Sequence, residues 1–409
     1  MDFSRPINET SGLRSEVARH VADVAGQVLA LSKSIHADPE LSFDENRASA
    51  AITTLLESSG FTVSRGVAEL PTAFTATAGT GRLVVGICVE YDSLPNLGHA
   101  CGHNIIAGAS VAAALGLRPL VDELDITLKV IGTPAEEHGG GKALLLERGV
   151  FDDVAIAMMI HPVQDGISYN PAGTTAQAVG RFRATFRGKA SHAAAAPHLG
   201  VNAADAAVVT QVAVGLLRQQ IPGDHRVAMF ISEAGYATNI IPDTAVVEFE
   251  CRAFTLPEYN ALLARVHSCF EAGALATGAS LEIVPTEPLY EPLIQDDVLS
   301  SHWSEAMAFF GHNVERSSGI SGGSTDMGNI SQVLPSIHPW VSVPGADVAI
   351  HSHDFVAVAD TPNAYRVMFE SAIAMGWTIT GLTADESQVQ QFLAAAESRR
   401  VATSKAGAV

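Results

Sequence analysis

One apolar run constrains the fold of this chain more than any other stretch of its sequence. Residues 83–89 read Leu-Val-Val-Gly-Ile-Cys-Val, without a polar side chain, and Glu90-Tyr91-Asp92 follows at once. A strand with no polar face is covered on both sides, as strands in α/β sheets are. The run therefore predicts an α/β fold.

Polar residues that can bind a ligand follow this run and further strand-like segments. These are residues 126–131 before Glu136-Glu137, residues 154–160 before His161-Pro162, and residues 340–343 and 348–350 before His351-Ser352-His353-Asp354. In open α/β sheets, ligand sites form at the carboxyl ends of the strands, so we expect these side chains to converge there. The alternative for Glu90 and Asp92 is that they only mark where the strand reaches solvent.

The residue types in these positions indicate a metal centre. Cys101 and His103 lie two residues apart in the segment 98–104, and sulfur, nitrogen and carboxylate ligands together suit zinc or a similar divalent ion. Of the adjacent Glu136 and Glu137, one can bind the ion. The other can take a proton from bound water, whose pKa the ion lowers to about 7, and pass it to a leaving amine. The alternative for this pair is a solvated helix N-terminus, where acidic residues are common.

The length of the chain and its pattern of elements predict two domains. At 409 residues, 47% of them hydrophobic, the chain is too long for one core of ordinary size. Between residues 176 and 288, strand and helix patterns follow one another as βαββαβ, the ferredoxin-like split unit. We therefore predict a discontinuous metal-binding domain from residues 1–175 and 289–409, with residues 176–288 inserted as an α+β domain.

Composition excludes several functional classes. With 44 acidic and 24 basic side chains, the formal net charge is −20, which argues against nucleic acid or an anionic membrane surface as a partner. The N-terminus lacks an export pattern, and no window reaches the roughly 18 apolar residues of a membrane span. Four cysteines without a pairing pattern fit a reducing compartment. We expect a soluble, cytoplasmic protein.

Seven short motifs, in order along most of the chain, resemble those of the co-catalytic zinc metallopeptidases. This family includes aminoacylase, bacterial glutamate carboxypeptidase and the amidohydrolases of N-acyl and auxin conjugates. The motifs are Tyr91-Asp92-Ser93-Leu94-Pro95, His99-Ala100-Cys101-Gly102-His103-Asn104, Thr133-Pro134-Ala135-Glu136-Glu137, His161-Pro162, Gly188-Lys189-Ala190-Ser191-His192-Ala193, Pro197-His198-Leu199-Gly200-Val201-Asn202-Ala203 and His351-Ser352-His353-Asp354-Phe355. Residues 324–329 and 239–243 further resemble the branch of p-aminobenzoyl-glutamate hydrolase subunits and dipeptidase-like mammalian relatives. The resemblance implies a mixed sheet flanked by helices, with the inserted domain as a lid and dimerisation domain.

The resemblance also implies roles in the metal centre. One or two divalent ions would be bound, zinc by preference because of the thiolate, with manganese, cobalt or nickel as alternatives. Their ligands would be Cys101, His103, Glu137, His161 and His351. Glu136 would be the water-activating base, Asp92 would orient a ligand, and His353 is the alternative last ligand. The chain departs from the family where an early His-x-Asp ligand pair reads Glu90-Tyr91-Asp92, so the first metal position must be built differently.

In the inserted domain, the resemblance implies a catalytic histidine and contacts to the substrate. His192 would enter the active site of the neighbouring subunit and stabilise the oxyanion, which implies a homodimer through this domain. Asn239 and Arg252 would grip the carboxylate of the substrate, and His198 is a further candidate for substrate binding. From spacing alone, His192 could equally be a histidine hydrogen-bonded at a loop corner, and Arg252 a structural residue at a strand edge.

Together these features predict a metal-dependent amidohydrolase. Its substrate would be a small N-acyl amino acid, a dipeptide or an aryl-amide conjugate with a free carboxylate. One alternative is hydrolytic deamination of an aromatic amine on the same scaffold. The other is a metal-bound subunit without activity, against which the intact Glu136-Glu137 pair and His192 argue.

Overall fold

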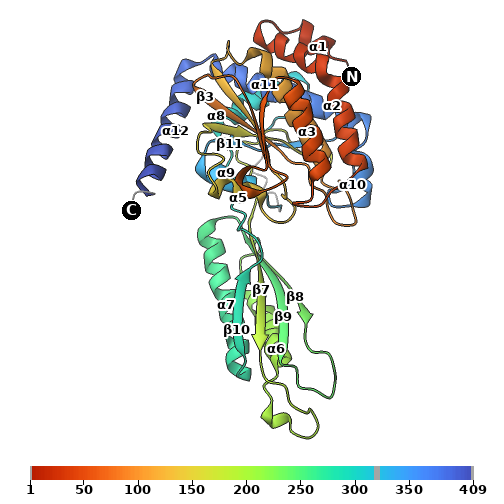
Figure 1. The fold of residues 1–409 in the computed structure, drawn as a ribbon, viewed down its shortest axis with the longest axis vertical. Coiled ribbons are helices and arrows are strands. Elements are labelled where there is room, and N and C mark those ends of the chain that lie inside the picture. The colour runs from red at the N-terminus through yellow and green to blue at the C-terminus, as the bar shows by residue number, and fades with distance from the viewer. Residues whose placement is uncertain (1, 317–322, 407–409) are drawn as a thin grey trace. The chain divides into compact units, whose positions relative to one another are not determined.

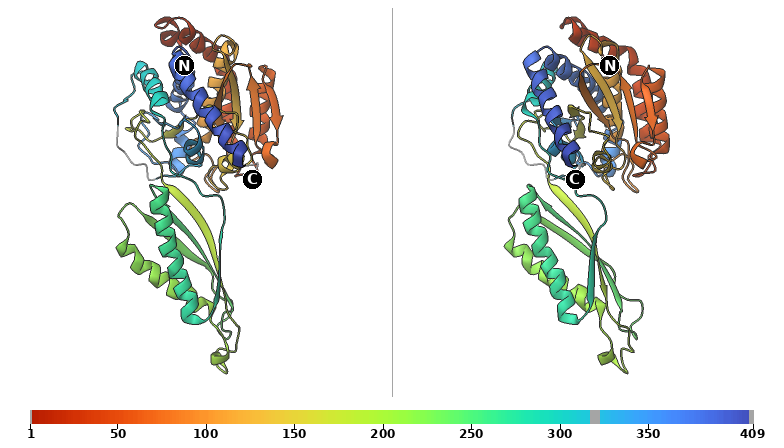
Figure 2. Two further views of the ribbon diagram at one scale, coloured as in Figure 1. Left: turned by 90° about the vertical axis from the view of Figure 1, so that its left-hand side faces the viewer. Right: turned by 60° about the vertical axis from the view of Figure 1, so that its left-hand side comes forward.

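The computed structural model describes residues 2–316 and 323–406, which divide into two compact units (Figure 1 and Figure 2). The larger unit comprises residues 2–175, 294–316 and 329–406, and the smaller unit comprises residues 176–293 and 323–328. In sequence, the smaller unit therefore interrupts the larger one. None of the described helices is both long and apolar enough to cross a membrane.

The larger unit is built around a six-stranded mixed sheet with the strand order β1-β2-β4-β3-β5-β11. These strands are β1 (Thr62–Arg65), β2 (Phe74–Ala78), β3 (Leu83–Val89), β4 (Ile126–Gly132), β5 (Ile156–Met158) and β11 (Ser336–Ile337). β3, β4, β5 and β11 run parallel, and β1 and β2 add antiparallel strands at one edge. β3 is the apolar run that predicted the sheet, and none of its residues is exposed. The predicted α/β class with a mixed sheet is confirmed.

A separate two-stranded parallel sheet pairs β6 (His161–Val163) with β12 (Trp340–Ser342). Residues 154–160 thus form only the short β5 before the chain enters a second sheet at His161. The expected strand at residues 348–350 was wrong. Pro344 and Gly345 turn the chain after β12, with Gly345 in the left-handed region at φ 83°, and the chain then continues as a loop.

Helix α4 (His103–Leu117) packs between the sheet and two further helices, and all of its residues are buried. Its small residues permit this close packing. A Cβ at Gly108 would lie 2.2 Å from Met368 Sδ, and one at Gly116 would lie 2.6 Å from Val21 Cγ2. The other helices of this unit are α1 (Ser4–Asn8), α2 (Leu13–Ala37), α3 (Asn46–Ser58), α5 (Gly141–Glu147), α8 (Asp297–Phe309), α9 (Met327–Val333, which begins in the smaller unit), α10 (His353–Val358), α11 (Pro362–Thr383) and α12 (Glu386–Ala406).

The smaller unit has the predicted element order βαββαβ. Its elements are β7 (Ala178–Arg187), α6 (Ala203–Leu217), β8 (Arg226–Glu233), β9 (Thr244–Ala253), α7 (Leu256–Thr277) and β10 (Ser280–Pro285). The strands form an antiparallel sheet in the order β10-β7-β9-β8, which is the ferredoxin-like arrangement. Alternate residues of β9, among them Val247 and Phe249, are buried, and they form a core with residues of both helices.

Helix α7 allows a matched test of this core. Leu262 is 3% exposed and Leu275 is 86% exposed on the same helix. We expect Leu262→Ala to lower the free energy of unfolding of the smaller unit by about 2–5 kcal/mol, because it leaves a cavity. Leu275→Ala should change it by no more than about 0.5 kcal/mol. Urea unfolding followed by circular dichroism measures both, and equal effects of the two substitutions would contradict the described packing.

Candidate metal centre

The ends of β3 and β4 bring four carboxylates to one place. Val89 and Gly132 are paired in the parallel register of these strands, so the segments that follow leave the sheet together. Thr133 donates hydrogen bonds to the Val89 carbonyl from its backbone nitrogen and its hydroxyl, at 2.8 and 2.9 Å. The carboxylates that follow, Glu90, Asp92, Glu136 and Glu137, are all buried. Their burial removes the alternative that Glu90 and Asp92 only mark where the strand reaches solvent.

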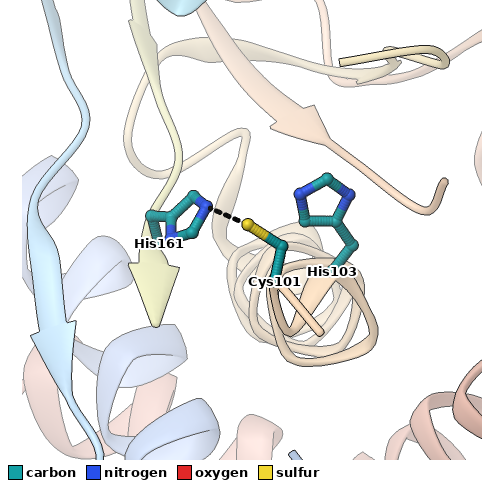
Figure 3. A group of neighbouring side chains, drawn as sticks. All are labelled: Cys101, His103 and His161. Carbon is teal, nitrogen blue, oxygen red and sulfur yellow. Dashed lines mark hydrogen bonds between the residues drawn. The ribbon is translucent and has the colours of Figure 1, made fainter. Parts of the chain in front are cut away.

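Cys101, His103 and His161 face one another in the larger unit (Figure 3). Gly102 between the first two has φ 72°, and a Cβ there would lie 2.6 Å from Pro162 Cγ, so this turn requires glycine. His161 Nδ1 lies 2.8 Å from the Pro162 carbonyl oxygen, which sets its proton on Nδ1. Its Nε2 is thereby left to face Cys101 Sγ, at 3.4 Å.

His351 approaches the same sulfur from the other end of the chain. Its Nε2 lies 3.1 Å from Cys101 Sγ and 3.7 Å from Glu137 Oε2. The His351 backbone has φ 63°, and its N–H donates to the Ala100 carbonyl at 2.9 Å, which fixes the loop against the cysteine segment. His353 is exposed at the start of α10 and belongs to none of the donor groups among the described residues.

The donor atoms fit two divalent ions that share one ligand. Cys101 forms one group with His103 and His161 and another with Glu137 and His351, and the donor atoms of each group lie within 4.8 Å of one another. Ligand atoms of one tetrahedral zinc ion lie roughly 3.5 Å apart. Among the described residues, His103 Nε2 and Glu137 Oε1 are buried without a hydrogen-bond partner, as expected of atoms that bind a metal. A third group joins Glu90, His103 and Glu136.

Asp92 holds His103 and the glutamate loop in place. Its Oδ1 lies 3.0 Å from His103 Nδ1, while Oδ2 accepts from the Glu137 N–H at 3.0 Å and from the Ser42 hydroxyl at 2.9 Å. Burial alone would raise the pKa of Asp92, but the hydrogen bond and charge of His103 outweigh it and lower this pKa to about 2. The contact directs His103 Nε2 toward the carboxylates.

Burial also shapes the protonation of the other donors. It lowers the pKa of His161 to about 3, so this imidazole is neutral and able to bind a metal through its nitrogen. Burial, together with the nearby charge of Glu137, raises the pKa of the Cys101 thiol well above its ordinary value. A cation at the site would reverse that preference, because a thiol that binds a metal gives up its proton.

Two residues that support the site were missed from the sequence. Glu45, which precedes α3, accepts from the Ala135 N–H at 2.8 Å, and Ala135 has a left-handed φ of 61°. Burial, followed by the charge of Asp92, raises the pKa of Glu45 to about 7. The other residue is Lys142, fully buried at the start of α5 and paired with Glu90. In the sequence, an acid before an amphipathic helix and a lysine after a run of glycines both resemble surface residues. The one signal for Lys142 was that a basic residue follows closely after the acidic pair Glu136-Glu137.

In the smaller unit, the loops of His192 and Asn239 are neighbours. Both residues are exposed, and the Ala193 N–H donates to the Asn239 carbonyl at 3.0 Å. His192 Nδ1 accepts from the Ala194 and Ala195 N–H groups, at 3.2 Å each. A hollow of about 520 Å³ lies beside these loops, and Ala193, Asn202 and Tyr236 are part of its lining.

The other two candidate substrate contacts differ in their surroundings. Arg252 on β9 donates to Glu250 from Nε at 2.8 Å and from Nη2 at 3.3 Å, and its Nη1 donates to the Ser324 hydroxyl at 3.1 Å. Its guanidinium is therefore fixed within the smaller unit, and its side chain is 21% exposed. His198 is exposed in the short turn Pro197–Leu199.

Comparison with known proteins identifies relatives over most of the chain. Residues 89–373 match the model of peptidase family M20/M25/M40. The Xaa-Arg dipeptidase of Mus musculus is 37% identical over 383 residues, which covers 90% of this chain and 88% of that protein. One of the p-aminobenzoyl-glutamate hydrolase subunits of Escherichia coli is 33% identical over 264 residues, covering 60% of this chain and 54% of that protein.

A solved structure supports the fold. A Bacillus subtilis protein described as a dinuclear metal-binding peptidase from the M20 family superposes with a TM-score of 0.60 at 24% identity, covering 86% of this chain and 98% of that one. The predicted family and fold are thereby confirmed. The chain belongs to peptidase family M20/M25/M40, and it is an enzyme of the hydrolase class, of the metallopeptidase and amidohydrolase type.

Proposed function

We propose that this chain hydrolyses the amide bond of a small substrate with a free carboxylate: a dipeptide, an N-acyl amino acid or an aryl-amide conjugate. The observation that carries the proposal is that two metal-donor groups share Cys101 beside a buried glutamate pair. Dipeptides come first because a relative named as a dipeptidase covers 90% of the chain.

The chain's own residues suggest how such a site would work. Cys101, His103 and His161 would hold one divalent ion, and Cys101, Glu137 and His351 the other, with zinc favoured by the sulfur ligand. Ions held there would supply polarisation of a carbonyl oxygen and would lower the pKa of a water molecule. Glu136 Oε2 lies 3.9 Å from His103 Nε2, so its carboxylate stands beside this donor, where it would accept a proton from water and donate it to the leaving amine.

Residues of the smaller unit would bind and polarise the substrate. His192 Nδ1 accepts two backbone hydrogen bonds, so the ring proton lies on Nε2, which can then donate to an oxyanion. Asn239 and His198 are exposed and able to contact a substrate. Arg252 would bind the substrate carboxylate by exchanging part of its contact with Glu250 for a charge-assisted pair.

A substrate panel with a base variant tests the proposal. Metal-loaded protein is incubated with dipeptides, including ones that end in arginine, with N-acetyl amino acids and with p-aminobenzoyl-glutamate, and the released amine is quantified. Glu136→Gln should lower kcat by about 10²–10⁴ at unchanged metal content, because it removes the proton acceptor. Glu147→Gln, at the exposed end of α5, is the matched control and should keep full turnover. Full turnover in Glu136→Gln, or none in the loaded wild type, would contradict the proposal.

The shared sulfur makes a separate prediction about metal content. Cys101→Ala should lose both ions, with an affinity loss beyond the roughly 10–100-fold that outer-shell changes cause, whereas His161→Ala should lose one ion. Cys251→Ala, a buried cysteine of the smaller unit, is the control and should bind metal normally. Mass spectrometry of the bound metal after dialysis measures the stoichiometry. Two tightly held ions in Cys101→Ala would refute a bridging role.

A homodimer through the smaller unit is part of the proposal. Helix α6 exposes Val208, Val212 and Leu216 at intervals of four residues, and β8 is an edge strand with Phe230 exposed. Exposed apolar stripes and unpaired strand edges are typical of surfaces that a partner covers.

The dimer can be tested by charge substitution. The double variant Val212→Glu and Leu216→Glu should elute as a monomer in size exclusion with light scattering, because two carboxylates would be buried at the interface. Leu275→Glu on α7, a position that is still more exposed than Val212 and Leu216, should leave the mass unchanged. A dimeric double variant, or a monomeric wild type, would exclude this surface.

A further inference from the structure

A buried ion pair lies beside the metal centre and takes no part in either of the two groups that share Cys101. Lys142 Nζ donates to Glu90 Oε1, and both side chains are 0% exposed. Glu90 directly follows β3, and Lys142 is the second residue of α5, which follows the loop of Glu136 and Glu137. A buried ammonium is costly unless it is paired, so a lysine in this place has a specific task.

The second carboxylate oxygen of Glu90 lies about as close to His103 Nε2 as the nearest oxygens of Glu136 and Glu137. Glu90 Oε2 is 3.6 Å from His103 Nε2, compared with 3.8 Å for Glu137 Oε1 and 3.9 Å for Glu136 Oε2. Glu90, His103 and Glu136 also lie close enough together to hold an ion. Distance to His103 therefore does not decide which carboxylate becomes a ligand of the ion beside this histidine, and Glu90 differs from Glu137 by its contact with Lys142.

We propose that Lys142 keeps Glu90 out of the coordination sphere of the ion beside His103. Its ammonium compensates the charge of Glu90 and engages one of its oxygens, so this ion is held by Cys101, His103 and His161. Lys142 thereby also supplies the positive charge that a third ion between Glu90, His103 and Glu136 would bring. It is a positioning residue that sets the number of ions and their ligands, and the inference rests on the proposed metal centre.

Four variants separate the charge of Lys142 from its size. They are Lys142→Met, Glu90→Gln, the double variant with both changes, and the control Lys129→Met. Lys129 on β4 is paired with Asp153 at 2.6 Å, with its side chain 12% exposed. The measurements are zinc stoichiometry, zinc affinity by competition with a coloured chelator, and the visible spectrum of the cobalt-substituted protein, which reports coordination number. Thermal unfolding shows whether each variant is folded.

We expect Lys142→Met to bind zinc at least about tenfold more tightly, or to bind an additional ion, because Glu90 then turns to the nearest remaining cation. Its cobalt absorption should weaken as an oxygen ligand is added. The double variant should return to wild-type affinity and spectrum, because an amide is a poor ligand. Lys129→Met should bind zinc as the wild type does, whereas Glu90→Gln leaves the Lys142 ammonium uncompensated beside the site and should bind zinc more weakly.

Two outcomes would overturn the inference. A folded Lys142→Met with wild-type affinity, stoichiometry and spectrum would show that the ammonium does not control Glu90. A loss of about tenfold or more in the zinc affinity of the double variant, whose local charge equals that of the wild type, would show that Glu90 is a ligand in the wild type. The second result decides the question even when Lys142→Met does not fold. Failure of the metal centre itself would appear separately, as a wild type that binds no zinc.

Discussion

Burial of negative charge at the carboxyl ends of β3 and β4 is the constraint on which the rest of the structure depends. Glu90, Asp92 and Glu137 are all removed from solvent, and a protein interior tolerates such charges only when each is compensated. Asp92 is satisfied by His103, by the Glu137 N–H and by Ser42. Glu90 is paired with Lys142. Bound cations would compensate the remaining charge, in keeping with the nitrogen, sulfur and oxygen donors that lie together where the parallel strands end.

The loop that follows β4 is fixed by backbone conformations that are rare for residues other than glycine and by close packing. Ala135 adopts a left-handed conformation, and Glu45 accepts its N–H inside the protein. A Cβ at Gly141 would lie 1.8 Å from the Pro134 carbonyl oxygen, so the loop closes on itself without space for a side chain. A strained backbone such as that of Ala135 persists where surrounding contacts hold it in place, which is typical of functional sites. Here it fixes the adjacent Glu136 and Glu137 just beyond the end of β4.

The sequence predicted those features whose signal is local. The apolar run that became β3 predicted a covered parallel sheet, and the βαββαβ pattern predicted the arrangement of the smaller unit. The candidate ligands could be named because each lies in a short motif that is recognisable on its own. The pairing of Arg252 with Glu250 and of Lys142 with Glu90 could not be predicted, because the partner of a charged side chain depends on the tertiary structure. The strand expected at residues 348–350 was wrong because a short apolar triplet does not distinguish a strand from a loop, and here the triplet lies in a partly exposed loop after the turn at Pro344 and Gly345.

The distance along the chain between two of the donors has a consequence for how the protein matures. Cys101 and His351 are 250 positions apart, and the whole of the smaller unit is synthesised between them. Closing so large a loop carries an entropic cost that only the assembled larger unit offsets. A nascent chain that has not yet emerged beyond residue 350 lacks one side of the donor set, whatever the supply of metal in the cell. Completion of the donor group of Cys101, Glu137 and His351 is thus a late event, and an ion bound there would link segments that are far apart in the polypeptide.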